Sequence, residues 1–155
     1  MNSFIKILLF TFLPFLMAAG CEDANTSCGE PGISGTDLTD SLVNDLKCSL
    51  KKLTDQDEVT FSIKSQDEWN EWLNCETAES AIDFTEEFIV GGRYRSYQCG
   101  YLKDFQLTDE CEAVRVEVIV EARDCEAITE VYFFHSIPLN YSERKIEFTI
   151  KQIEQ

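Results

Sequence analysis

The sequence has little positive charge. Its 155 residues include 13 lysines and arginines against 29 aspartates and glutamates, for a formal net charge of −16 at pH 7. So acidic a chain repels nucleic-acid phosphates and anionic lipid headgroups, which disfavours nucleic-acid binding and polybasic docking to membranes. Acidic residues spread along a chain also form an ordinary solvated surface, and the partners that this charge favours are cations and basic proteins.

Histidine is nearly absent as well. The single one, His135, lies inside a predicted strand, and no serine has the flanking glycines of a nucleophile elbow. Residues 55–58, Asp-Gln-Asp-Glu, carry oxygen ligands that suit calcium but lack the glycine and distal glutamate of an EF-hand loop. Carboxylate pairs such as Asp83 with Glu86 are too frequent in this chain to indicate glycoside hydrolysis. We therefore expect no catalytic residue, no metal and no cofactor, and interpret the protein as a non-enzyme.

The chain also lacks an apolar run long enough to cross a bilayer. One positive charge is followed by the apolar residues 7–17, which is the order found in a secretory signal. This apolar run is shorter than the about 20 residues of a membrane helix, and Pro14 interrupts it. Residues 18–20, Ala-Ala-Gly, directly precede Cys21, and this arrangement resembles the lipobox of bacterial lipoproteins. We expect residues 1–20 to be a signal peptide and Cys21 to carry a lipid such as palmitate. Cleavage without lipid is the alternative.

Residues 21–36 are polar and rich in glycine, with no apolar periodicity, which predicts a flexible tether after the lipidated cysteine. The acidic pair Glu22-Asp23 resembles lipoprotein sorting signals, which retain proteins at the inner membrane in some bacteria and export them to the surface in Bacteroidetes-type bacteria. The expected location is the cell envelope, on the outer membrane or cell surface rather than the inner membrane. Residues 37–155 then form a single globular domain.

Six cysteines remain once Cys21 is assigned to lipid. No two of them have the two-residue spacing of a zinc knuckle or a thioredoxin-type site, and their number is even. In an exported chain these features favour disulfides, which would stabilise a small domain by restricting its unfolded state. The sequence does not select the pairing of the candidates, which are Cys28, Cys48, Cys75, Cys99, Cys111 and Cys125.

Two segments have helical patterns. Leucines recur at helical spacing over residues 37–53. Residues 65–68, Ser-Gln-Asp-Glu, have the pattern of a capping box, and Trp69, Trp72 and Leu73 follow on one helical face. A face of this kind packs a helix against a sheet, and an aromatic platform for a ligand is the alternative.

Elsewhere apolar residues alternate with polar ones, as in strands. Gly91-Gly92 indicates a turn or bulge after Val90, and a turn at residues 140–142 favours antiparallel pairing of the last two strands. We predict an α+β fold, mainly an antiparallel β-sheet with one or two short helices packed on a face, stabilised by disulfides. The clearest strand segments are residues 58–64, 88–90, 114–120, 132–137 and 145–151.

The order of these motifs resembles a known group. A strand is followed by Ser-Gln-Asp-Glu-Trp at 65–69, Ile-Asp-Phe at 82–84 and Gly91-Gly92, and then by a β-rich half, as in small uncharacterised cell-envelope lipoproteins of Bacteroidetes-type bacteria. Residues 59–150 are also distantly similar to the protease-complex stabilising subunit family, which has an aspartate-phenylalanine motif and a later glycine-glycine-tyrosine loop. Here residues 99–101, Cys-Gly-Tyr, replace that loop. The resemblance implies that the protein binds and stabilises, or restrains, an envelope protease.

The expected function is therefore that of a lipid-anchored, non-catalytic binding protein. Its candidate contact region is a loop after Val90, where aromatic residues and the rare positive charges concentrate: Arg93, Tyr94, Arg95, Tyr97 and Tyr101. In the alternative interpretation these tyrosines line the face of a strand. Two other functions stay open, a glycan-binding module or carbohydrate-active enzyme that uses aromatics with carboxylates, and a structural envelope component.

Overall fold

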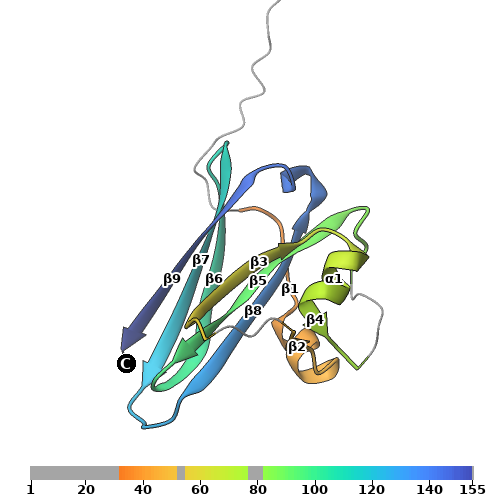
Figure 1. Cartoon of the computed structure of the whole chain (residues 1–155). Helices are drawn as coiled ribbons and strands as arrows, with labels where there is room; N and C mark the ends of the chain where they lie inside the picture. The colour runs from red at the N-terminus through yellow and green to blue at the C-terminus, as the bar shows by residue number, and fades with distance from the viewer. Residues whose placement is uncertain (1–31, 52–54, 77–81, 155) are drawn as a thin grey trace, which may run out of the picture.

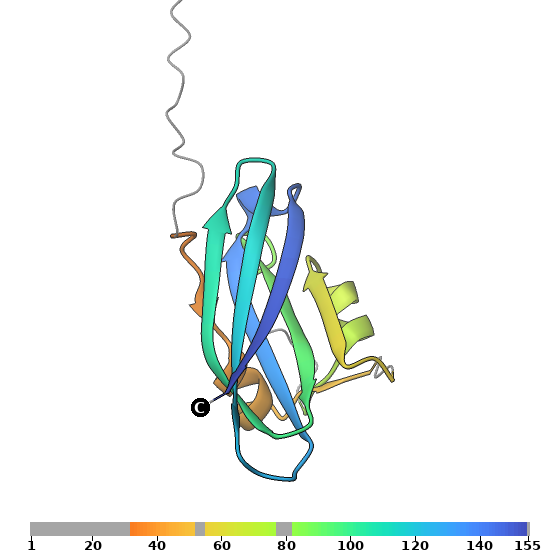
Figure 2. The same cartoon turned by 90° about the vertical axis from the view of Figure 1, so that its left-hand side faces the viewer.

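The computed structural model describes residues 32–51, 55–76 and 82–154, and in them the chain forms two large β-sheets packed face to face and a small two-stranded one (Figure 1). The first sheet has the antiparallel order β1-β8-β5-β3, with β1 at Thr36–Asp37, β3 at Glu58–Ile63, β5 at Glu87–Ser96 and β8 at Thr129–Pro138. The second has the order β6-β7-β9, with β6 at Cys99–Asp109, β7 at Ala113–Arg123 and β9 at Lys145–Glu154 (Figure 2). The predicted β-rich, mainly antiparallel fold is confirmed.

The predicted signal peptide, Cys21 and most of the predicted tether lie outside the described residues. The last residues of the tether belong to the domain, because Ile33 is buried in the core between the sheets and Thr36 pairs with Ser136 in the first sheet. No helix in the described part of the chain is long and apolar enough to span a membrane.

The valine-rich strand β7 supplies much of that core. Val114, Val116, Val118 and Val120 are fully buried, as their alternation with polar residues predicts. They contact the inner face of the first sheet, where Phe88, Val90, Val131, Phe133 and Ile137 project from β5 and β8.

Gly91 and Gly92 form neither the expected turn nor a bulge. Both lie in the middle of β5 and pair with β3 and β8. A Cβ atom on Gly92 would lie 2.3 Å from the Val59 carbonyl oxygen and 2.6 Å from the Phe133 ring. The glycines therefore make room for neighbouring backbone and aromatic rings inside a continuous strand.

The predicted antiparallel pairing of the last two strands is also wrong. After β8, the short 3₁₀-helix η2 (Leu139–Tyr141) carries the chain to the other sheet, where β9 runs parallel to β7. One side of β8 is paired with β5 along its length, and β1 occupies the other side at residues 135 and 136. In its actual position β9 packs Ile146, Phe148 and Ile150 against the core between the sheets.

A second core lies on the outer face of the first sheet, beneath the helix α1 (Gln66–Trp72). The Ser65 hydroxyl accepts from the Glu68 amide, which confirms half of the capping box, whereas the Glu68 carboxylate accepts from the Lys64 amide rather than that of Ser65. Trp69 is buried, and Trp72 stacks on Phe61 with 4.7 Å between ring centroids. The tryptophans thus fasten the helix to the sheet.

The helix predicted over residues 37–53 is much shorter. A single π-helical segment, η1 (Ser41–Asp45), is followed by β2 (Ser49–Leu50), which pairs with β4 (Leu73–Asn74) at the end of α1. Lys47 has a φ of 46°, a left-handed conformation that ends a helix. The disulfide Cys48–Cys75 joins the same two segments, so pairing with a distant strand overrides the local helical pattern.

The prediction of disulfides is confirmed for two pairs, Cys48–Cys75 and Cys99–Cys125. Cys99–Cys125 links the start of β6 to the segment between β7 and β8. Cys111 is disulfide-bonded too, and Cys28 lies outside the described residues.

Candidate functional site

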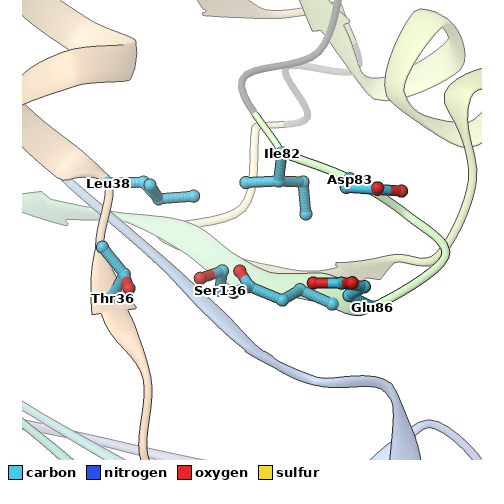
Figure 3. Close-up of a pocket in the computed structure, with 7 residues that line it drawn as sticks. Thr36, Leu38, Ile82, Asp83, Glu86 and Ser136 are labelled. Carbon is cyan, nitrogen blue, oxygen red and sulfur yellow. The ribbon is translucent and has the colours of Figure 1, made fainter.

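An acidic cleft of about 260 Å³ opens on the outer side of the first sheet (Figure 3). It lies where three parts of the chain meet: strand β1, strand β8, and the segment that precedes β5. Figure 3 shows Thr36 and Leu38 on one side, Asp83 and Glu86 on the other, and Ser136 between them. Its lining residues are Thr36, Leu38, Ile82, Asp83, Glu86, Glu87 and Ser136.

A tight turn holds the acidic side of this cleft in place. The Oδ1 atom of Asp83 accepts from the Thr85 amide at 2.8 Å and from its hydroxyl at 2.7 Å. The amides of Glu86 and Glu87 both donate to the Asp83 carbonyl at 3.0 Å. The hydrogen bonds from Thr85 lower the pKa of Asp83 below its usual value, so this group is a carboxylate at neutral pH.

The opposite wall depends on close backbone approach between β1 and β8. A Cβ atom on Gly35 would lie 2.7 Å from the Ser136 carbonyl oxygen, so only glycine fits there. The Leu38 amide donates to the Phe134 carbonyl at 2.9 Å, which fixes the chain beyond β1. This approach brings Thr36 and Leu38 to the cleft.

The floor of the cleft is polar. Ser136 is only 1% exposed, and it faces away from the core that contains Ile137. Ser136 lines the cleft, and a serine hydroxyl can both donate a hydrogen bond to a ligand and accept one from it.

The carboxylates of the cleft are not neutralised by the protein itself. Among the described residues, no lysine or arginine forms a salt bridge with Asp83, Glu86 or Glu87. The nearest arginines along the chain, Arg93 and Arg95, form salt bridges with Glu130 instead. The cleft is thus a concentrated negative site with aliphatic walls, suited to a long cationic side chain.

The predicted contact region after Val90 is not a loop. Strand β5 runs to Ser96 and turns directly into β6. Arg93 is fully buried, donates to Glu130 at 2.8 Å and to the Gln56 carbonyl at 2.5 Å, and therefore presents no surface to a partner. Arg95 lies 3.6 Å from the same glutamate.

The three tyrosines of that region point in different directions. The Tyr94 hydroxyl donates to Gln152 of β9, so Tyr94 faces the other sheet. Tyr97 is 60% exposed in the connection between β5 and β6, and its hydroxyl donates to Asp57 at 2.8 Å. Tyr101 lies under the Arg123 guanidinium, 4.4 Å from the ring centroid. The structure therefore does not gather the predicted contact residues on one surface.

Tyr101 contributes instead to a second groove, of about 240 Å³, between η1 and the strands β6 and β8. Tyr132 lies in the same groove, where burial and a hydrogen bond to Glu130 raise its pKa to about 12. Asp40 and Asn44 approach from η1 and are hydrogen-bonded to each other at 3.3 Å. This groove combines aromatic rings with carboxylate and amide groups.

His135 belongs to neither hollow. Its ring stacks on Phe105 with 3.7 Å between centroids, and its Nδ1 atom lies 3.8 Å from the Asp37 carboxylate. Burial lowers the pKa of His135 below its usual value. Within residues 32–51, 55–76 and 82–154, no group of three or more histidines, cysteines or acidic residues is placed to hold a metal ion.

Comparison with known proteins gives no further assignment, because no family model, curated protein or solved structure matches this chain. Asp83 belongs to two sequence patterns. From sequence alone, Ile82-Asp83-Phe84 is part of the family resemblance, and the pair Asp83 with Glu86 is a chance pair of acids. Thr36 and Ser136 carried no sequence signal, because only the pairing of β1 with β8 brings them to the cleft.

Proposed function

We propose that this protein is a lipid-anchored, non-catalytic binding protein of the cell envelope, and that the acidic cleft binds a lysine or arginine side chain of a partner polypeptide. The observation that carries the proposal is the set of carboxylates on Asp83, Glu86 and Glu87, which have no cation of this chain beside them in its described part. The overall excess of acidic residues also attracts a basic partner at longer range.

The shape of the cleft fits such a side chain. The aliphatic stem would lie along Leu38 and Ile82, while the charged head meets the carboxylates of Asp83 and Glu86. The Ser136 hydroxyl can accept a hydrogen bond from the same head group. Because attraction between exposed charges is screened by salt, binding should weaken as ionic strength rises.

The partner class comes from the family resemblance, which implies an envelope protease that the protein stabilises or restrains. The predicted anchor at Cys21 would hold the domain at the membrane surface beside such a partner. Replacing Cys21 with alanine should abolish labelling by radioactive palmitate and release the protein from membranes. A wild-type protein that takes up no label would contradict the lipid anchor. It would not bear on ligand binding in the cleft, which needs its own experiment.

The cleft is tested by titrating the purified protein with a fluorescent peptide of alternating glycine and lysine, and with its acetyl-lysine counterpart. The triple variant Asp83→Asn, Glu86→Gln, Glu87→Gln should weaken binding of the lysine peptide by at least about tenfold. The matched control is Glu112→Gln, Glu126→Gln, Glu154→Gln, which removes the same charge from exposed residues that do not line the cleft. Equal losses in both triple variants would contradict a specific site, and so would equal binding of the two peptides.

The second groove favours a second candidate function, a glycan-binding module. Tyr101 and Tyr132 line this groove with aromatic rings, which are typical of sites that pack against the C–H face of a sugar, and Asp40 and Asn44 supply polar groups for its hydroxyls. A change in tyrosine fluorescence on adding saccharides, lost in Tyr101→Ala and retained in the acidic-cleft variant, would support this function. No response to a broad saccharide panel would remove it.

A further inference from the structure

Strand β9 leaves one long edge open. It has 10 residues, and β7 is the one strand that pairs with it in the described part of the chain. Figures 1 and 2 show β9 as the outermost strand of the second sheet, with the C-terminus at its end. Such an edge presents a row of backbone N–H and C=O groups that can pair with another strand.

The two faces of β9 carry different side chains. Ile146, Phe148 and Ile150 point toward the core, yet each is only half-buried because the strand lies at the rim of the sandwich. On the outer face Glu147, Thr149 and Lys151 alternate with them. An added strand on this edge would extend both faces and remove more of the apolar row from water.

We infer that β9 pairs antiparallel with β9 of a second copy of this chain, with the two-fold axis at Thr149. In this register Glu147 lies opposite the second copy's Lys151, and Phe148 lies opposite its Ile150. Two-fold symmetry repeats both contacts, and the two Thr149 residues meet at the centre. Charge, aromatic and threonine pairs are the three kinds of cross-strand pair that stabilise antiparallel strands.

The charges select this register. A shift of two residues in one direction places Lys145 opposite the second copy's Lys151, and a shift in the other direction leaves Glu147 opposite Ile153. Edge lysines commonly prevent pairing, whereas here the central register places Lys151 opposite a glutamate. The present partners do not compete strongly. Lys151 bonds to Glu117 at 2.9 Å and Lys145 bonds to Glu147 at 2.8 Å, both lysine side chains are more than half exposed, and exposed ion pairs contribute little.

Sedimentation of the purified wild-type protein over a concentration series should show a monomer–dimer equilibrium. Lys151→Glu and Glu147→Lys, tested separately, place like charges opposite one another twice per dimer and should weaken the dimer roughly tenfold to hundredfold. The double variant Glu147→Lys, Lys151→Glu restores opposite charges and should dimerise again. A monomeric wild type, or a double variant as weak as the single ones, would overturn the inference.

A covalent test fixes the register independently of stability. Thr149→Cys places two thiols at the two-fold axis and should give a dimer on a non-reducing gel, whereas Lys145→Cys places its thiol opposite Ile153 and should not. Circular dichroism confirms that each variant is folded. Equal cross-linking at both positions would overturn the proposed register.

Discussion

The Arg93 guanidinium donates to the Glu130 carboxylate at 2.8 Å, although none of the Arg93 side chain is exposed and 35% of the Glu130 side chain is. The two residues lie on adjacent strands, β5 and β8, on the outer face of the first sheet. A second guanidinium nitrogen reaches the Gln56 carbonyl. This positive charge is therefore held inside the fold rather than offered to a partner.

The first prediction concerns the asymmetry of this pair. Glu130→Gln keeps the shape and removes the charge, so the buried guanidinium loses its counterion, and the free energy of unfolding should fall by about 1–3 kcal/mol. Arg93→Met should cost less, because the remaining carboxylate is partly hydrated and the apolar chain fills the space. Urea unfolding monitored by tryptophan fluorescence measures both. A larger loss in Arg93→Met would contradict the prediction.

A second prediction uses His135. Its pKa is lowered by burial in the folded protein, so the unfolded chain takes up a proton at higher pH than the native one. The stability due to the neutral ring is fully present above the unfolded pKa of about 6.5 and decreases as the pH falls below it. Unfolding free energies at a series of pH values should show this decrease in the wild type and not in His135→Gln. Identical pH profiles would refute the assignment.

The third prediction tests the glycine pair in β5. Gly92→Ala adds a methyl group 2.3 Å from the Val59 carbonyl oxygen and against the Phe133 ring, so strand β3 or the ring must move. The expected loss is about 1–3 kcal/mol in the free energy of unfolding. Thr60→Ala, at the exposed residue paired with Gly92, is the control and should change stability by less than about 0.5 kcal/mol. Thermal denaturation of both variants decides the matter.

The last prediction concerns the disulfide Cys48–Cys75, which joins the segment after η1 to the end of α1. Replacing both cysteines with serine should lower the free energy of unfolding by about 2–4 kcal/mol, because the unfolded chain gains freedom. Of the strands in the two large sheets, only the edge strand β3 lies within the segment that this bridge closes, so most of the β-sheet signal in far-ultraviolet circular dichroism should persist. Loss of that signal would show that the bridge is needed for the whole fold rather than for its helical part.

Several elements follow from neighbours in the sequence. Residues 65–72 form a helix because the cap and the tryptophan spacing act within two turns, and β7 forms where valines alternate with charged residues. The even cysteine count indicated disulfides but not their pairing. The predicted helix over 37–53 failed because β2 pairs with β4, and the predicted loop after Val90 failed because β3 and β8 pair with β5 on both sides.

The sequence by itself determined the acidic charge, the β-rich composition and the capped helix, all of which depend on residue type or on contacts a few positions apart. Only the tertiary structure decided that β9 runs parallel to β7, that Arg93 is buried, and that Thr36 and Ser136 meet Asp83 in one cleft. These features join residues tens of positions apart. Their outcome depends on which strand edges are open and which apolar faces still need burial, and local pattern does not encode either.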